Sequence, residues 1–275
     1  MNIAENKETI LISGVKCFDL DLTLGCGQAF RWQKTENGRW RGVAFGKALA
    51  ISQNADGNLL FDTSAGDFEQ IWRGYFDLDR DYSLLCEGFC ADNALKTAVE
   101  QFPGIRILRQ EPWEALCSFI ISQNNNIPRI KGIIERLCTA FGENIGGDSF
   151  AFPTARTIAN LSADDLAPIR AGFRAKYILD AAAKVVSGEI ALENLAEMPL
   201  DEARGELMKM KGVGLKVAEC ALLYGCGRHD AFPVDVWVKR IMEELYPAGF
   251  PACAAGAQGI AQQYLFHWRR TQRSG

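Results

Sequence analysis

The stretch that decides the fold is "LMKMKGVGLKVAECALLYG", residues 207–225. Its two glycines, Gly212 and Gly214, separate two segments whose apolar residues recur at helical spacing. A Gly-x-Gly turn between two helices exposes backbone N–H groups, and such groups at the start of a helix bind a phosphate without reading base sequence. On its own the pattern is more often plain turn chemistry, so it does not identify a nucleic-acid binder.

A lysine, Lys216, follows the turn where the second helix begins. The helix dipole is positive there, and an ammonium group at this end costs about 0.3–1 kcal/mol. The dipole, with burial against Val213 and Cys220, favours the neutral amine, which is a nucleophile. The competing interpretation is a solvated lysine that pairs with a DNA phosphate or with Glu219.

A carboxylate follows in "AFPVDVWVKRI", residues 231–241. Asp235 precedes a helical pattern, where the ordinary role of an aspartate is to cap the helix. A loop that joins successive helices can also return this carboxylate toward Lys216. A lysine nucleophile beside a carboxylate suits displacement at a sugar carbon, where positive charge develops, and Schiff-base chemistry with an aldehyde.

The rest of the chain predicts two domains within an α+β fold. Residues 1–83 hold short β-prone runs broken by turn signals at 37–38 and 56–57, as antiparallel hairpins require. Residues 84–275 show helical periodicity, with the hairpin at about 200–225. We therefore expect an N-terminal antiparallel β-sheet domain followed by an all-α body.

Composition and charge limit the class of protein. A hydrophobic share of 48% and a charged share of 23% are typical of globular proteins, and a net charge of −4 does not favour a nucleic-acid binder. Nine cysteines without a C-x-x-C pair, with only two histidines, predict reduced thiols in a cytoplasmic protein and no zinc site. The chain shows no secretory signal and no apolar run near the roughly 20 residues that span a bilayer. Three arginines at the end, Arg269, Arg270 and Arg273, predict a solvated basic tail.

The motifs together carry a resemblance to a known family. "KGVGLKVAEC" followed by "PVDV" resembles the signature of helix-hairpin-helix DNA glycosylases that are also abasic-site lyases. The resemblance continues through "GQAFRW", "YFDLD", "SFIISQNNNIPRI", "GFRAKYI" and "AQQYLF", and so covers most of the chain. These motifs are similar to those of 8-oxoguanine DNA glycosylase/lyases, especially the bacterial members.

This resemblance implies an activity and a partner. The expected reaction is excision of 8-oxoguanine opposite cytosine through a lysine Schiff base, followed by β-elimination, as part of base excision repair. The expected partner is double-stranded DNA that contains oxidised guanine. We expect a monomer that binds no membrane and, in a bacterium, lies at the nucleoid.

The resemblance also assigns roles to residues, because the lesion must be flipped out of the stack to reach a nucleophile. Oxidised guanine carries a hydrogen on N7, so a backbone carbonyl aimed at N7 accepts from the lesion and repels ordinary guanine. The assigned residues are Lys216 (nucleophile) and Asp235 (stabiliser of the cationic sugar); Gly27 (the carbonyl), Cys220 and Phe266 (the two faces of the base) and Gln262 (its Watson–Crick edge); Asn124, Arg129, Phe173 and Arg174 (the opposite cytosine and the wedge); and Lys211, Gly212 and Gly214 (the phosphate clamp).

Each assignment has a structural alternative. Gly27 is also typical of a β-turn, and Cys220 and Phe266 fit ordinary core packing. Asn126 can simply cap the helix that follows it. Arginines on helix faces, such as Arg129, are usually solvated.

The chain departs from the family pattern at three positions. Lys211 stands where many relatives have proline, which adds a contact for a phosphate. Phe173 replaces the tyrosine common in the wedge, so stacking survives and a hydroxyl is lost. Trp237 replaces a histidine of eukaryotic members, which puts one phosphate contact in doubt.

The resemblance implies no required cofactor, and no metal among the assigned side chains. The family's hairpin can hold a structural metal cation through backbone carbonyls, here those of Met208, Met210 and Val213. An iron–sulfur cluster with the spacing of endonuclease III-like glycosylases needs four closely spaced cysteines near the C-terminus, and only Cys253 lies beyond Asp235.

The match to the family pattern weighs against three alternative functions. The missing cysteines disfavour an endonuclease III-like enzyme for oxidised pyrimidines. Glycosylases for alkylated bases keep the aspartate but generally lack the lysine. A non-catalytic DNA-binding module that uses the hairpin only as a clamp would need neither Lys216 nor Asp235.

Overall fold

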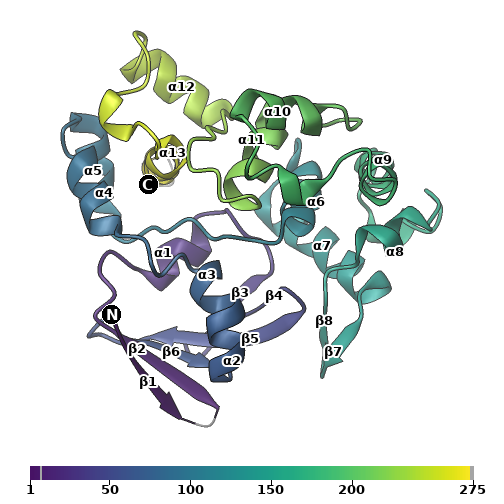
Figure 1. Cartoon of the computed structure of the whole chain (residues 1–275), viewed down its shortest axis with the longest axis horizontal. Coiled ribbons are helices and arrows are strands. Elements are labelled where there is room, and N and C mark those ends of the chain that lie inside the picture. The colour runs from purple at the N-terminus through teal and green to yellow at the C-terminus, as the bar shows by residue number, and fades with distance from the viewer. Residues whose placement is uncertain (7, 273–275) are drawn as a thin grey trace.

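A six-stranded sheet precedes a helical body in the computed structural model, which describes residues 1–6 and 8–272 (Figure 1). The strand order is β1-β2-β6-β5-β4-β3, and all neighbours are antiparallel. These strands are β1 (Asn2–Asn6), β2 (Thr9–Ser13), β3 (Trp32–Lys34), β4 (Trp40–Ala44), β5 (Lys47–Gln53) and β6 (Leu59–Asp62); a small separate hairpin is formed by β7 (Asn144–Gly146) and β8 (Ser149–Phe150).

The two turn signals in the N-terminal part produce the predicted hairpins. Thr35 N–H donates to the Arg39 carbonyl at 2.8 Å, and Asn54 N–H donates to the Asn58 carbonyl at 3.0 Å. Both turns contain a glycine with a positive φ, as a tight hairpin turn requires. The predicted antiparallel sheet followed by a helical body is therefore confirmed.

Helices supply the rest of the chain, and in Figure 1 those of the C-terminal half lie above the sheet. The α-helices are α1 (Leu20–Gly25), α2 (Ala65–Asp67), α3 (Arg73–Tyr75), α4 (Tyr82–Phe89), α5 (Asn93–Gln101), α6 (Pro112–Ser122), α7 (Ile127–Phe141), α8 (Ala155–Ala159), α9 (Arg174–Val186), α10 (Leu200–Met208), α11 (Leu215–Tyr224), α12 (Val236–Leu245) and α13 (Gln258–Thr271). A π-helix, η1 (Phe68–Trp72), and the 3-10 turns η2 (Ala167–Ile169), η3 (Leu192–Asn194) and η4 (Ala252–Ala254) complete the set.

Helix α6 is the central element of the helical body. Pro112 stands in its first turn, and the predicted apolar face is buried throughout. The helix packs against α7, α9 and α11, so its last residue, Ser122, ends beside the start of α11. Helix α6, in which residues 113–121 are all buried, therefore supports the first turn of α11.

Two hydrophobic cores support the two parts of the chain. One joins the sheet to α1, η1 and α3 and contains a cluster of aromatic rings, where the Trp32 indole N–H donates to the Tyr75 hydroxyl at 2.7 Å. The other fills the helical body and also includes Cys26 and Phe30 from the N-terminal part. The segment that carries Gly27 is thus anchored in the helical core as well as in the sheet domain.

The C-terminal arginines do not form a solvated tail. Arg269 makes an ion pair with Glu244 of α12, and the Arg270 guanidinium lies 5.7 Å from the centroid of the Phe266 ring. The prediction is therefore wrong for these two residues, because packing of α13 against α12 brings Glu244 to Arg269, and Phe266 lies one turn before Arg270 on α13. Arg273 lies outside the described residues.

Two further observations concern the whole described chain. All nine cysteines are free thiols. In residues 1–6 and 8–272, no helix combines the length and the apolar character that crossing a membrane would require.

Candidate active site

The hairpin between α10 and α11 is built as the glycine pattern predicts. Gly212 has a φ of +74°, and a Cβ atom there would lie 2.2 Å from a ring carbon of Tyr177 in α9. Gly214 is the N-cap residue of α11. Within residues 1–6 and 8–272, no group accepts from the N–H of either glycine. Both amides are therefore free to bind an anion outside the protein.

Lys211 differs from the two glycines in this turn. Its backbone N–H donates to the Asp180 carboxylate of α9 at 2.8 Å, and its Nζ lies 3.4 Å from the same carboxylate. The amide is thus used to hold the turn on α9. Only the side chain, which is 76% exposed, remains available for a phosphate.

Lys216 lies half-buried in the first turn of α11, beside the end of α6. Its Nζ is 3.4 Å from the Ser122 Oγ and 5.2 Å from the centroid of the Phe119 ring. Because the Ser122 hydroxyl donates to the Phe119 carbonyl at 2.8 Å, its oxygen presents a lone pair to the amine. Neither residue was assigned from the sequence, although both stand in "SFIISQ"; only the packing of α6 on α11 reveals them.

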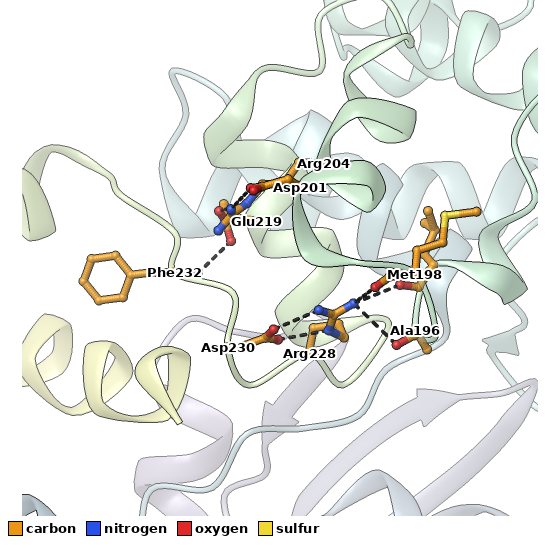
Figure 2. A network of polar contacts seen from close by, with 9 residues as sticks. Ala196, Met198, Asp201, Arg204, Glu219, Arg228, Asp230 and Phe232 are labelled. Atoms are coloured by element: carbon orange, nitrogen blue, oxygen red, sulfur yellow. Dashed lines mark hydrogen bonds and ion pairs between the residues drawn. The ribbon is translucent and has the colours of Figure 1, made fainter. Parts of the chain in front are cut away.

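Cys220 follows Lys216 by one helical turn. Burial raises the pKa of the Cys220 thiol to about 11, against the opposing effect of Lys216, so the sulfur is neutral near pH 7. The pairing of Lys216 with Glu219 that the sequence left open is wrong. Glu219 points into the protein, where it accepts from Arg204 and from the backbone of Phe232 (Figure 2).

Asp235 caps α12, as expected for an aspartate before a helix. Its Oδ1 accepts from the N–H groups of Trp237 at 2.9 Å and Val238 at 2.8 Å. Its negative charge also contributes to raising the pKa values of the Cys220 thiol and the Tyr224 hydroxyl, in which burial is the larger cause. The Asp235 carboxylate is therefore near enough to α11 to act on Cys220 and Tyr224, which follow Lys216 by one and two helical turns.

Gly27 lies in the turn after α1 and approaches the helical body closely. Its φ is +93°, and a Cβ atom there would lie 3.2 Å from Nη1 of Arg270 and 3.3 Å from Cδ1 of Ile127. The positive φ is a conformation that favours glycine over other residues. The contact with α13 shows that the turn also faces the helix that carries Gln262 and Phe266.

Gln28, the next residue, fixes this turn and was not assigned from the sequence. Its side chain is 1% exposed, and its Nε2 donates to the carbonyls of Thr23 at 2.8 Å and Arg106 at 2.7 Å. Its Oε1 accepts from the N–H of Leu108 at 2.9 Å, and its own carbonyl accepts from Gln110 Nε2 at 2.8 Å. These bonds fix the peptide beside Gly27, and three of the partners, Arg106, Leu108 and Gln110, are too distant in the sequence to be predicted.

Gln262 and Phe266 are four residues apart on α13 and so project from one face of the helix. Gln262 is 4% exposed, and no group in residues 1–6 and 8–272 donates to its buried Oε1. An unsatisfied buried acceptor of this kind costs about 1–3 kcal/mol, which a bound donor would recover. Phe266 is only partly buried, with Arg270 over its ring, so simple core packing does not describe it.

The loop between α6 and α7 carries Asn124, one of the residues assigned to the opposite cytosine, and Arg129 follows in α7. Asn124 is exposed and has a φ of +46°, which is uncommon for a residue with a side chain. Asn126 caps α7 by accepting from the Arg129 N–H at 3.0 Å, as the alternative interpretation proposed. The Arg129 side chain is exposed beside this loop.

Arg174 holds the same loop from α9. It is 3% exposed and donates to the carbonyls of Gln123 at 2.8 Å, Asn124 at 2.9 Å and Ala171 at 3.1 Å. Burial, and to a lesser extent Arg129, lowers the pKa of Arg174. Its guanidinium lies 4.5 Å from the ring centroid of Phe173, which is itself 50% exposed. The expectation that helix-face arginines are solvated is therefore wrong here, because this one fixes the backbone of the loop between α6 and α7.

Cavity volume does not locate the site. A cavity of about 470 Å³ lies between the β3–β5 strands and α7, with Arg31, Arg41 and Lys131 among its lining residues. None of the residues assigned from the sequence lines it. The candidate site is defined instead by the side-chain contacts around Lys216, Gly27 and the loop between α6 and α7.

Two family models match the chain in succession. Residues 10–116 match the model described as "8-oxoguanine DNA glycosylase, N-terminal domain", and residues 117–250 match the "HhH-GPD superfamily base excision DNA repair protein" model. Among curated proteins, an N-glycosylase/DNA lyase of Saccharomyces cerevisiae is 31% identical over 89% of this chain and 70% of that protein. A probable N-glycosylase/DNA lyase of Methanothermobacter thermautotrophicus is 30% identical over 84% and 83%.

Solved structures agree with these matches. The structure of MBOgg1 in complex with a low-affinity DNA ligand has a TM-score of 0.93 and 42% identity, covering 99% of both chains. The Clostridium acetobutylicum 8-oxoguanine glycosylase/lyase, in complex with double-stranded DNA containing cytosine opposite 8-oxoguanine, has a TM-score of 0.92 and 36% identity, again covering 99% of both chains. The chain therefore belongs to the 8-oxoguanine DNA glycosylase family, within the helix-hairpin-helix N-glycosylase/DNA lyases.

Proposed function

We propose that this chain excises 8-oxoguanine opposite cytosine from duplex DNA and then cuts the strand at the resulting abasic site. The observation that carries the proposal is the place of Lys216 in the first turn of α11, against the end of the buried helix α6, with the charge of Asp235 acting on Cys220 one turn along α11. An amine can form a Schiff base at a sugar carbon, and a carboxylate can stabilise the positive charge that develops there. The related Clostridium enzyme, whose complex holds cytosine opposite 8-oxoguanine, supports the choice of substrate.

The excision step follows from the chemistry of these two groups. The neutral amine of Lys216 forms a bond to C1′ of the flipped nucleotide as the bond from C1′ to the base breaks. The base leaves with the electron pair of that bond and takes up a proton. The Asp235 carboxylate stabilises the positive charge that develops on the sugar.

Strand cutting follows from the covalent product. Opening of the sugar ring gives a protonated imine between Lys216 and C1′, which makes the C2′ hydrogen acidic. Loss of that proton lets the C3′–O3′ bond break, so the 3′ phosphate leaves with the electron pair. Water then hydrolyses the imine and restores the amine.

Recognition of the lesion rests on Gly27 and on α13. The Gly27 turn is held by Gln28, so its carbonyl can meet the N7–H of 8-oxoguanine in a fixed position. The unpaired Oε1 of Gln262 can accept from the donors on the Watson–Crick edge of the base. Cys220 and Phe266 can then cover the two faces of the ring.

Substitution of Gly27 tests this pocket. We expect Gly27→Ala to slow excision by roughly tenfold, equivalent to about 1.4 kcal/mol, because its Cβ atom would crowd Arg270 and Ile127. Gly38→Ala is the matched control, since Gly38 has a φ of +79° but a Cβ atom there would meet no other atom within 4 Å. Both variants suffer similar backbone strain, so single-turnover rates and melting temperatures together separate crowding of the pocket from loss of stability. An equal loss of rate in Gly38→Ala would contradict the assignment.

Cytosine preference is proposed to depend on Asn124, Arg129 and Arg174 around the Phe173 wedge. We expect Arg129→Ala to reduce the ratio of rates on 8-oxoguanine opposite cytosine and opposite adenine by about tenfold, since one good base contact is worth about 1–3 kcal/mol. Arg156→Ala, which removes an exposed arginine from α8, should leave the ratio unchanged. An unchanged ratio in Arg129→Ala would show that this arginine does not read the opposite base.

Phosphates are proposed to bind at Gly212, Gly214 and the exposed side chain of Lys211. No cofactor is required, because side chains supply both the nucleophile and the counter-charge. A structural metal cation is proposed at the carbonyls of Met208, Met210 and Val213, among which Met210 already accepts from the Val213 N–H at 3.1 Å. A carbonyl oxygen has two lone pairs, so this bond leaves one free for a cation.

The proposed setting is a monomer in the cytoplasm, at the nucleoid if the source is bacterial. The free state of all nine cysteines fits a reducing compartment.

Borohydride trapping on duplexes with 8-oxoguanine opposite each normal base tests the proposed function. A covalent adduct that is strongest opposite cytosine supports it. Trapping confined to oxidised pyrimidines would overturn the substrate, and the absence of any adduct would overturn the lyase chemistry.

A further inference from the structure

Glu219 is a buried carboxylate that links three elements around the candidate site. It stands on α11, three residues after Lys216, and is 3% exposed. Its Oε1 accepts from Nε of Arg204 on α10 at 2.6 Å, and its Oε2 accepts from the backbone N–H of Phe232 at 2.7 Å. Figure 2 shows both contacts, with Phe232 on the loop that leads to α12. Both oxygens are therefore engaged inside the protein.

The bond to Phe232 joins the lysine helix to the second half of the aspartate loop; the first half is joined to the same helix by the Arg228 N–H, which donates to the Leu222 carbonyl at 3.0 Å. Phe232 precedes Asp235 by three residues, and the intervening Pro233 has a fixed φ angle. Between residues 231 and 234, no other backbone hydrogen bond of the described chain reaches a different helix. The first half of the loop is also held by the Arg228–Asp230 ion pair and the bond from Arg228 to the Met198 carbonyl (Figure 2).

We propose that Glu219 is a positioning residue that sets the Asp235 carboxylate relative to the Lys216 amine. Glu219 and Lys216 share one helix, so a bond from Glu219 to the loop transmits the position of that helix to Asp235. Arg204 neutralises the buried charge and turns the carboxylate toward the loop. Glu219 does not touch the reacting atoms, since both of its oxygens are occupied elsewhere. The proposal rests on the excision reaction described above.

The Glu219→Gln variant removes this link with little change in volume. Glutamine keeps one carbonyl oxygen, but its amide group faces either Arg204 or the Phe232 N–H, which are both donors. We expect the single-turnover excision rate on an 8-oxoguanine:cytosine duplex to fall by tenfold or more. Some loss of melting temperature is expected as well, because the Arg204 charge loses a buried partner.

A double-mutant cycle with Asp235→Asn separates positioning from general destabilisation. If Glu219 acts through Asp235, Glu219→Gln slows excision strongly in the wild-type background and by less than twofold in the Asp235→Asn background. A merely structural role would slow both backgrounds by the same factor, and that result would overturn the proposal. So would an unchanged excision rate in Glu219→Gln with a lowered melting temperature.

Asp201→Asn is the matched control. Asp201 also accepts from Arg204, at 2.5 Å, but it is exposed and does not contact the Asp235 loop. We expect an excision rate within twofold of wild type, whereas a loss equal to that of Glu219→Gln would assign the effect to Arg204 and overturn the proposal.

Glu219→Asp is a second variant, to be used if Glu219→Gln does not fold. Glu219→Asp keeps the charge beside Arg204 and withdraws the oxygens by one methylene group, so the same cycle applies to it. Excision by the wild-type protein tests the proposed reaction, whereas the double-mutant cycle tests only the role of Glu219. A failure of the proposed function can therefore be told apart from a failure of the positioning role.

Discussion

Replacing Lys216 with glutamine is expected to abolish borohydride trapping and strand cutting, and to slow excision on the order of 10³-fold or more. Glutamine approaches the length of lysine but has no amine that can attack C1′. The side chain is half-buried, and its contacts with Ser122 and Phe119 are long, so the fold should be retained. The measurement is gel analysis of trapped adducts, with binding to a duplex carrying a stable abasic analogue as a check of the DNA surface.

The control for this variant lies on the same hairpin. Lys209→Gln makes the same chemical change at a lysine whose Nζ donates to Glu206 at 2.6 Å, away from the end of α6. It should give the wild-type adduct. An adduct of wild-type intensity in Lys216→Gln would show that another amine is the nucleophile, and Lys216 would then be a phosphate contact.

Replacing Asp235 with asparagine is expected to slow excision by about 10²–10³-fold with little change in melting temperature. A loss of this size is typical when one group that stabilises the charge developing in the transition state is removed. Stability is preserved because the asparagine carbonyl can still accept from the N–H groups of Trp237 and Val238 and so cap α12. Single-turnover excision and thermal denaturation measure the two effects separately.

Two further variants complete this experiment. Asp235→Ala removes both the charge and the cap, and should cost a further 1 kcal/mol or so of stability. Asp81→Asn makes the conservative change at an aspartate that caps α4 in the same way, through the N–H groups of Ser83 and Leu84, and should excise at the wild-type rate. A wild-type rate in Asp235→Asn would reject the carboxylate as the stabiliser of the sugar cation.

Features that depend on neighbouring residues could be predicted from the sequence. The Gly-x-Gly turn, the helix caps at Asn126 and Asp235, and the two hairpins of the sheet all follow from φ preferences and side-chain bonds within a few residues. The position of Lys216 in the first turn of a helix, which favours a neutral amine, can also be predicted from neighbouring residues. The family resemblance supplied the remaining roles, which local patterns alone could not rank above turn or core positions.

Features that depend on distant partners were decided only by the tertiary structure. The sequence left Glu219 as a partner for Lys216, whereas the fold turns it toward Arg204 and the backbone of Phe232. Likewise, Arg174 binds the Gln123 carbonyl, 51 residues away, so an arginine expected on a solvated face is buried. The physical reason is that a buried polar group must find a partner within about 3 Å, and packing of the helices, not spacing along the chain, determines which groups come that close.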